Sequence, residues 1–152
     1  MRVLGRASAL VILSLGAAGG VIADAGTPMA AHVRSANERL EDVTAALAEG
    51  YTAIPCADGF DGATAVHYVN SKYLQDAVPD IGRPQGLLYE NNGDGRLTLV
   101  AVEYVTMAGP VSLGGQPFKL LLAPDRYRLV VWAWKPNPLG GFAEANPDAS
   151  CE

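Results

Sequence analysis

The sequence predicts an α+β domain in which one N-terminal helix packs on an antiparallel β-sheet or a partly open barrel. Two observations support this class. One stretch of helical periodicity lies near the start of the chain, and most of the remaining chain consists of short apolar runs separated by Gly, Pro, Asn and Asp. A helix that precedes a series of strands lies on one face of the sheet that they form. The chain has 152 residues, the length of one domain.

Residues 1–25 have the organisation of a secretory signal peptide. Two arginines precede an uncharged, apolar stretch over 7–22, which leads into the cleavage pattern Ala23-Asp24-Ala25. The alternative is a membrane anchor, for which this stretch is short. We therefore expect export of the protein and a single α+β domain over residues 26–152.

Charge and composition limit the kinds of partner that we expect this protein to bind. The whole chain has 11 Lys and Arg against 16 Asp and Glu, and without its first 25 residues the net charge is −6. A negatively charged protein repels phosphate backbones, which argues against a nucleic-acid partner. Two His and two Cys are too few for an all-protein zinc site, so no metal or cofactor is predicted. No later stretch is long and apolar enough for a transmembrane span, and the expected partner is a small molecule or an envelope protein.

Cys56 and Cys151 are predicted to form a disulfide. Export brings both to the periplasm or the medium, where an isolated pair of cysteines oxidises. The bond would hold the chain end against the start of the domain and close a loop of roughly 100 residues, a stabilisation of up to about 4.7 kcal/mol in the chain-entropy model. The alternative is a nucleophilic thiol at Cys56, which needs a neighbouring base and a reducing compartment.

The helix is predicted over residues 36–49. Ser35-Ala36-Asn37-Glu38 matches the capping box, and Gly50 stands where a helix C-cap glycine would. Three apolar residues at helical spacing are expected to pack on the sheet, namely Leu40, Val43 and Leu47.

The strongest strand is predicted over residues 96–106. Both of its faces are apolar, so we expect it at the centre of the sheet. It forms a predicted hairpin with 86–90 through the turn Asn91-Asn92-Gly93-Asp94-Gly95. One or two helical turns are expected over 71–77, and an irregular tail from residue 135. The remaining strands are predicted over 51–55, 63–70, 117–122 and 127–134.

Two polar residues stand inside strongly apolar strands, His67 in Ala65-Val66-His67-Tyr68-Val69 and Glu103 within residues 97–105. Burial of either group demands a partner, so the two would meet if both face the interior. A His–Glu pair can act as a general base or as half of a metal site. The alternative is a structural histidine and a carboxylate bound to a backbone amide, an Arg or a Tyr.

Trp132 and Trp134 are two residues apart and are expected on one face of their strand. Such a pair either belongs to the core or forms the floor of a ligand pocket. We expect at least one of the two indoles within contact distance of His67 and Glu103.

The segments 62–70, 86–104 and 129–151, and with them most of the mature chain, resemble a group of exported bacterial proteins of similar length. The shared pattern consists of His67-Tyr68-Val69-Asn70, Leu-Val-Ala-Val-Glu-Tyr over 99–104, Trp132-Ala133-Trp134, two Asn-Pro pairs and the late Cys151. The group has no assigned activity, so the resemblance supplies no mechanism. A His often precedes the Val-Trp of its aromatic strand, where this chain has Val130, and this difference weakens the case for a metal enzyme.

These observations predict an exported globular domain that binds a small molecule or a partner without catalysis, because the sequence contains no complete catalytic motif. One alternative is an acid/base enzyme, a hydrolase or an isomerase, that uses His67 and Glu103. The other is a structural protein of the cell envelope. The candidate binding residues are His67, Glu103, Trp132 and Trp134, and the sequence identifies no catalytic residue.

Overall fold

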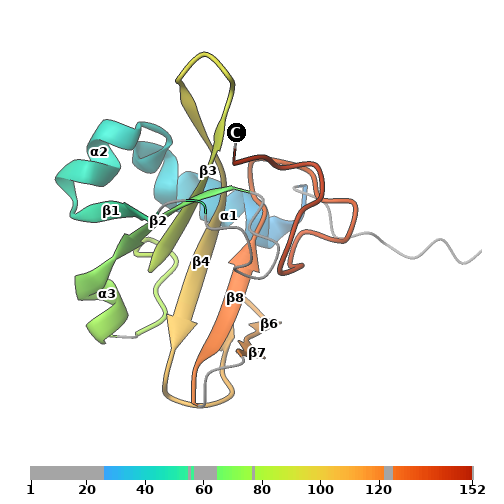
Figure 1. Ribbon diagram of the computed structural model, residues 1–152. Coiled ribbons are helices and arrows are strands. Elements are labelled where there is room, and N and C mark those ends of the chain that lie inside the picture. Colours follow the sequence, from blue (N-terminus) through green and yellow to red (C-terminus); the bar gives the residue numbers. More distant parts are fainter. Residues whose placement is uncertain (1–25, 55, 57–64, 77, 122–124, 152) are drawn as a thin grey trace, which may run out of the picture.

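The computed structural model describes residues 26–54, 56, 65–76, 78–121 and 125–151, and its main feature is a six-stranded antiparallel sheet (Figure 1). The strand order is β1-β2-β3-β4-β8-β7. Helices cover one face of this sheet, and the C-terminal tail packs on the other. The predicted α+β class, with a helical layer on an antiparallel sheet, is confirmed. The predicted signal peptide over 1–25 lies outside the described residues.

The long strand β4 lies inside the sheet between β3 and β8, as predicted from its two apolar faces. The predicted hairpin is also present, with Gly93 at φ +78° and Gly95 at φ +82° in the turn. The strand predicted over 127–134 ends early, at Val131. The bounds are β1 Tyr51–Ile54, β2 Val66–Asn70, β3 Gly86–Asn91, β4 Leu97–Thr106, β7 Lys119–Leu120 and β8 Tyr127–Val131, with β5 Ser112–Leu113 and β6 Gln116–Pro117 in a separate two-stranded sheet.

The prediction of one helix over 36–49 is wrong. The region contains α1 (Pro28–Asn37), the 3₁₀ helix η1 (Glu38–Glu41) and α2 (Val43–Ala48). Capping explains the boundaries, because Thr27 Oγ1 accepts a hydrogen bond from the Ala30 amide at 3.1 Å at the start of α1. The predicted capping box therefore falls within α1 and η1 instead of beginning a helix.

A second cap begins α2. Asp42 Oδ1 accepts a hydrogen bond from the Thr44 amide at 2.8 Å. The hydrogen bond from the Thr44 hydroxyl, followed by this one from the amide, lowers the pKa of the Asp42 carboxyl. Because α2 begins at Val43 and not at residue 36, the side chains that face the sheet differ from those predicted. Leu40 is buried and Val43 packs against the core, as predicted, but Leu47 is 52% exposed. Gly50 ends the helical region with φ +93°, a conformation that favours glycine.

Three buried tyrosines connect the sheet to the segments packed on it. Tyr89 donates its hydroxyl to the carbonyl of Leu40 in η1. Tyr51 donates to Pro84 O at 2.6 Å, and Tyr104 donates to Ile81 O at 2.8 Å. Burial raises the pKa of all three hydroxyls, because an apolar environment disfavours the phenolate.

A β-bulge in β4 decides which side chains face the tail. Leu88 pairs with Ala101 but Tyr89 pairs with Leu99, so Val100 is the extra residue. Leu99 consequently faces the helical layer, whereas Val100 and Ala101 both join the apolar cluster beneath the tail. Beyond the bulge the alternation resumes, and Glu103 lies on the same face as Ala101.

The buried tyrosines predict that the free energy of unfolding falls as pH rises above about 10, where an unfolded tyrosine titrates. Their pKa values are higher in the folded protein, so only the unfolded state loses these protons between the two values. The stabilisation is complete below the unfolded pKa and is lost progressively above it. Urea unfolding at a series of alkaline pH values measures this, and Tyr89→Phe should reduce the slope. A free energy of unfolding that does not change in this range would contradict the prediction.

Candidate functional site

His67 and Glu103 lie on the tail-side face of the sheet, on β2 and β4 with β3 between them. His67 pairs with Leu88 of β3, and Glu103 pairs with Gly86 of the same strand. The Nδ1 atom of His67 is 3.7 Å from Oε2 of Glu103. The two side chains therefore meet across β3, at the separation of an ion pair and beyond that of a hydrogen bond.

Gly86 makes this meeting possible. A methyl group at position 86 would come within 2.6 Å of Glu103 Oε2 and 3.2 Å of Glu103 Cβ. The carboxylate thus occupies the space that a side chain on β3 would fill, and it reaches over the backbone toward His67. The sequence contains this glycine at the start of a predicted strand, but nothing in the sequence indicates which side chain lies over it.

Arg128 on β8 is a third member of this cluster, and the sequence analysis did not propose it. It pairs with Val105 of β4, which places it beside Glu103 on the same face. Its Nη1 donates to Glu103 Oε1 at 3.4 Å, and its Nε donates to Glu144 Oε2 of the tail at 2.7 Å. A signal was present in the sequence, because Arg128 is a charged residue in an apolar strand in the same way as Glu103.

These four side chains form a charged row of His67, Glu103, Arg128 and Glu144. Glu103 is 7% exposed and Arg128 is 9% exposed, so Glu103 depends on Arg128 for compensation of its charge, and Arg128 depends on Glu103 and Glu144. The structure contains one of the alternatives expected for Glu103, a carboxylate bound to an arginine. His67 is the member of the pair that is open to solvent, with 22% of its side chain exposed against 9% for that of Glu103.

The tryptophans do not share a face, so that prediction is wrong. Trp132 is buried in the tail-side cluster and donates its Nε1 hydrogen to Ala143 O at 2.8 Å. Trp134 packs against the opposite, helix-side core and donates to Glu41 Oε1 at 2.7 Å. The strand ends at Val131, so the alternation of side chains expected for a strand does not extend to Trp134.

Trp132 is on the same face as His67, with two strands between them. β3 and β4 lie between β2 and β8, and their residues Leu88 and Ala101 occupy the intervening positions of the tail-side cluster. Of the four candidate residues, the structure thus brings together His67 and Glu103. It places Trp132 in the neighbouring packing and Trp134 on the other side of the sheet.

Two buried asparagines organise the tail, residues 135–151, next to the charged row. Asn137 Nδ2 donates to Ala145 O at 2.9 Å, and Asn146 Nδ2 donates to Pro136 O at 3.0 Å. Each amide therefore satisfies the carbonyl of the residue that precedes the other asparagine. Each Oδ1 also accepts an amide hydrogen two residues further on, at 2.9 Å and 3.0 Å. This reciprocal arrangement accounts for the asparagines of the two Asn-Pro pairs seen in the sequence.

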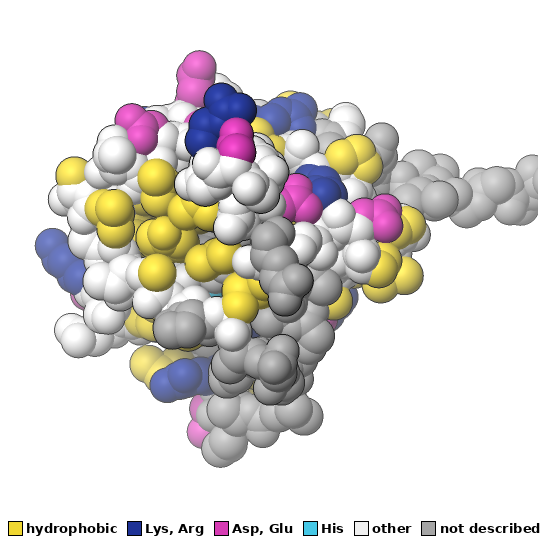
Figure 2. All heavy atoms as spheres, turned by 45° about the horizontal axis from the view of Figure 1, so that its top comes forward, with side chains coloured by type: hydrophobic (Ala, Val, Ile, Leu, Met, Phe, Trp, Pro, Cys, Tyr) yellow, Lys and Arg dark blue, Asp and Glu magenta, His cyan; other side chains and the backbone are white. Residues whose placement is uncertain are grey.

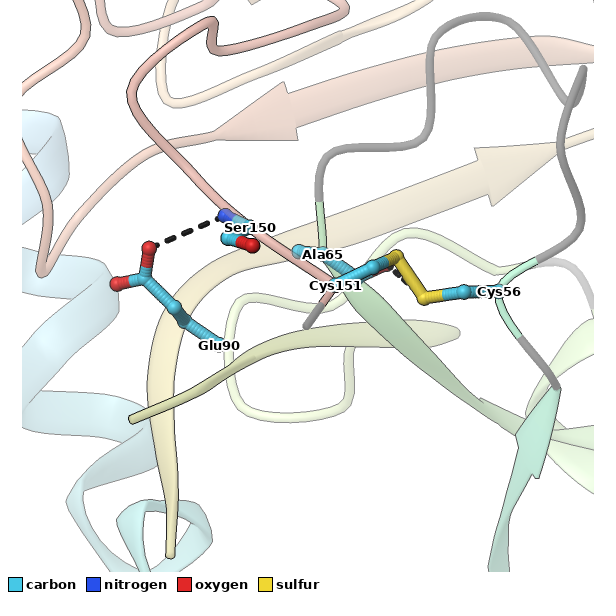
Figure 3. The surroundings of a disulfide bond; sticks show 5 residues. All are labelled: Cys56, Ala65, Glu90, Ser150 and Cys151. Atoms are coloured by element: carbon cyan, nitrogen blue, oxygen red, sulfur yellow. Dashed lines mark hydrogen bonds between the residues drawn. A yellow bond between two sulfur atoms is a disulfide. The ribbon is translucent and has the colours of Figure 1, made fainter. Parts of the chain in front are cut away.

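Glu90 and the disulfide hold the two ends of the tail, as Figure 3 shows for its last residues. Lys135 Nζ lies 2.6 Å from Glu90 Oε1, which also accepts the Ser150 amide at 3.1 Å. Cys56 and Cys151 are bonded with their Cα atoms 6.1 Å apart, which confirms the predicted pair. A thiol nucleophile at Cys56 is thereby excluded in this form of the protein.

Three observations on the described residues bear on a bound group and on a membrane. No three or more His, Cys, Asp or Glu side chains among them are grouped so as to hold a metal ion. A depression next to Tyr73 has a volume of about 10 Å³, enough for one water molecule. None of the helices in the described part of the chain is long and apolar enough to cross a bilayer.

Protein-family models, curated proteins and solved structures yielded no match to this chain. We therefore infer the chemistry of the site from its geometry.

Gly86→Ala should destabilise the protein by about 1–3 kcal/mol, the usual cost of forcing an extra carbon into a packed site. The new methyl group would displace the Glu103 carboxylate, which lies 2.6 Å from its position. Gly82→Ala is the matched control, because the nearest atom there is Asp80 Oδ1 at an ordinary 3.6 Å. Urea unfolding of the two variants measures the difference, and equal effects would contradict the packing described.

Replacement of both Cys56 and Cys151 by Ser should lower the free energy of unfolding by about 2–4 kcal/mol. The loss arises because the unfolded chain gains freedom and the tail loses its covalent attachment. Denaturant unfolding followed by tryptophan fluorescence measures it, since Trp132 lies under the tail. The wild-type protein in excess dithiol is the control and should behave like the variant. An unchanged free energy of unfolding in both samples would show that the bond contributes nothing.

Proposed function

We propose that this chain is an exported, disulfide-bonded domain that binds a partner or a small molecule without catalysing a reaction on it. The observation that carries the proposal is the engagement of Glu103 by Arg128. Glu103 is a buried carboxylate already engaged with a buried guanidinium, so accepting a proton or ligating a metal would cost this contact and leave Arg128 with Glu144 as its carboxylate partner. His67 is a partly exposed polar group on this face, suited to a hydrogen bond with a bound molecule.

Export is supported by two independent features. The first 25 residues have the organisation of a signal peptide, and Cys56 is bonded to Cys151. Disulfides persist in the periplasm and the medium, where thiols are not kept reduced. The tail depends on this bond at its end, so an oxidising compartment suits the fold.

A second candidate function is acid/base catalysis by His67 with Glu103 as its orienting carboxylate. The distance of 3.7 Å between them and the partial exposure of the imidazole favour it. A general base of this kind needs hydrogen-bond contact with its carboxylate and with the substrate, and catalytic contacts often tighten when a substrate binds. A bound substrate would have to draw Glu103 toward His67 without breaking its contact with Arg128.

The two functions are distinguished by a ligand screen on the oxidised, exported form, whose N-terminus we expect at Gly26. A ligand that raises the melting temperature of the wild type should raise it less in His67→Ala, because binding to the folded state alone stabilises it. His32→Ala is the matched control, since His32 is exposed on α1, a helix on the opposite face of the sheet.

Mass spectrometry of the same mixtures detects chemical conversion. Recovery of the ligand unchanged supports a binding protein. Conversion that is lost in His67→Ala and in Glu103→Gln would replace this proposal with the catalytic one. A stabilising ligand that affects wild type and His67→Ala equally would show that binding occurs elsewhere on the molecule.

A further inference from the structure

The turn between β3 and β4 contains the one Asn-Gly pair of the sequence, Asn92-Gly93. The turn projects from the sheet at the top of Figure 1, and this end of the molecule comes forward in Figure 2. All residues from Asn92 to Arg96 are exposed. Water and hydroxide ions therefore reach both the side chain of Asn92 and the backbone of Gly93.

Gly93 presents its backbone nitrogen to the side chain of Asn92 with little hindrance. In any chain the nitrogen that follows an asparagine can attack the carbon of the side-chain amide, and a Cβ next to that nitrogen obstructs the approach. Gly93 has no Cβ, and apart from its chain neighbours no heavy atom lies within 4 Å of the position that a Cβ would take. Its φ of +78° is a conformation that glycine adopts without strain, so the backbone can rotate toward the Asn92 side chain.

We propose that Asn92 is a site of spontaneous modification, at which the side-chain amide becomes a carboxylate. Hydroxide removes the Gly93 amide proton, and the nitrogen attacks Asn92 Cγ. The N–Cγ bond forms, the Cγ–Nδ2 bond breaks, and ammonia leaves with a proton from water. Water then opens the cyclic imide, at Cγ to give aspartate or at the main-chain carbonyl of Asn92 to give isoaspartate. Both products carry one additional negative charge, and no oxidant or reductant takes part.

Two hydrogen bonds in the turn restrain the reacting groups. Asn92 Nδ2 donates to Thr98 Oγ1 at 2.8 Å, and the Gly93 amide donates to Asn91 Oδ1 at 3.0 Å. Both bonds are exposed, so water competes for the same groups and each bond opens at little net cost. The attack requires that both open. The turn therefore slows the modification of Asn92 without preventing it.

The other asparagines of the chain lack this combination of features. Asn137 and Asn146 precede prolines, whose nitrogen has no proton to lose. Asn37 and Asn70 are buried, and Nδ2 of each donates to a backbone carbonyl. Asn91 is followed by Asn92, whose Cβ hinders attack by its nitrogen. Asn70, which precedes the small residue serine, is the internal control for the role of exposure.

The modification acts on the hairpin that anchors the tail. The Asn92 amide donates to Arg96 O at 3.0 Å, next to the last pair of the β3–β4 ladder. Aspartate leaves this backbone unchanged, whereas isoaspartate adds a carbon atom to the main chain and displaces the donor. Glu90 lies two residues before Asn92 and holds both Lys135 and Ser150. Amide hydrogens of the turn and of the end of the tail should therefore exchange faster in the isoaspartate form.

Incubation of the oxidised protein in neutral and in mildly alkaline buffer, followed by ion exchange and peptide mapping, tests the proposal. We expect an acidic species with its new carboxylate at Asn92, in both the aspartate and the isoaspartate form. It should accumulate faster at the higher pH, because hydroxide begins the reaction. Gly93→Ala should slow it at least about tenfold, since a methyl group disturbs the geometry of attack. Asn92→Gln should abolish it, because the longer side chain would have to close a larger ring.

Thr98→Val tests whether the structure restrains the reaction. It should raise the rate about two- to tenfold, which corresponds to the loss of one exposed hydrogen bond. Thr52→Val is the matched control, since Thr52 is an exposed strand residue of β1, away from the turn. Equal rates in Thr98→Val and the wild type would show that this bond does not restrain Asn92. A new carboxylate at Asn70 as fast as at Asn92, or an Asn92→Gln variant that becomes acidic at the wild-type rate, would overturn the proposal. No step involves His67, so the result is independent of the ligand screen.

Discussion

The C-terminal tail covers one face of the sheet without a helix or a strand in its described residues, and this sets the main constraint on the structure. A partly buried segment of this kind has peptide groups that no ladder satisfies, and buried peptide groups without a partner are costly. Asn137 and Asn146 solve the problem by exchanging hydrogen bonds between the two halves of the tail. Glu90 and the disulfide then fix the tail to the sheet at both ends.

The charged row depends on this docking. Glu144 comes from the tail and accepts a hydrogen bond from Arg128, which also donates to Glu103 on β4. Without the tail the guanidinium would keep one carboxylate, and more of the sheet would meet water. Gly86 adds a steric condition, because only a residue without a side chain lets Glu103 reach across β3. The tail and Gly86 thus together position the two buried charged side chains of the row, Glu103 and Arg128.

The helical region shows how tertiary structure overrides a local signal. The residues from Ser35 to Glu38 do match a capping box, but Thr27 and Asp42 make the caps that form. The sheet adds a further preference, since Tyr89 binds the carbonyl of Leu40 and Asn37 donates to Ile81 O at 2.7 Å. A helix that ran straight from residue 36 to 49 would not place these groups against their partners. Local patterns identify residues that can cap a helix, but long-range hydrogen bonds decide which of these residues do so.

The sequence by itself determined the class of fold, the central strand, the β3–β4 hairpin and the disulfide pair. Each depends on local information: apolar periodicity, turn residues, and the presence of only two cysteines. It also indicated that His67 and Glu103 need partners, because polar groups in apolar strands have few alternatives. Only the tertiary structure decided that Arg128 and Glu144 complete the row, that Gly86 makes room for it, and that Trp134 turns to the opposite face. These outcomes depend on strand register, on a bulge at Val100 and on where β8 ends, and a shift of one residue in any of them reverses which face a side chain occupies.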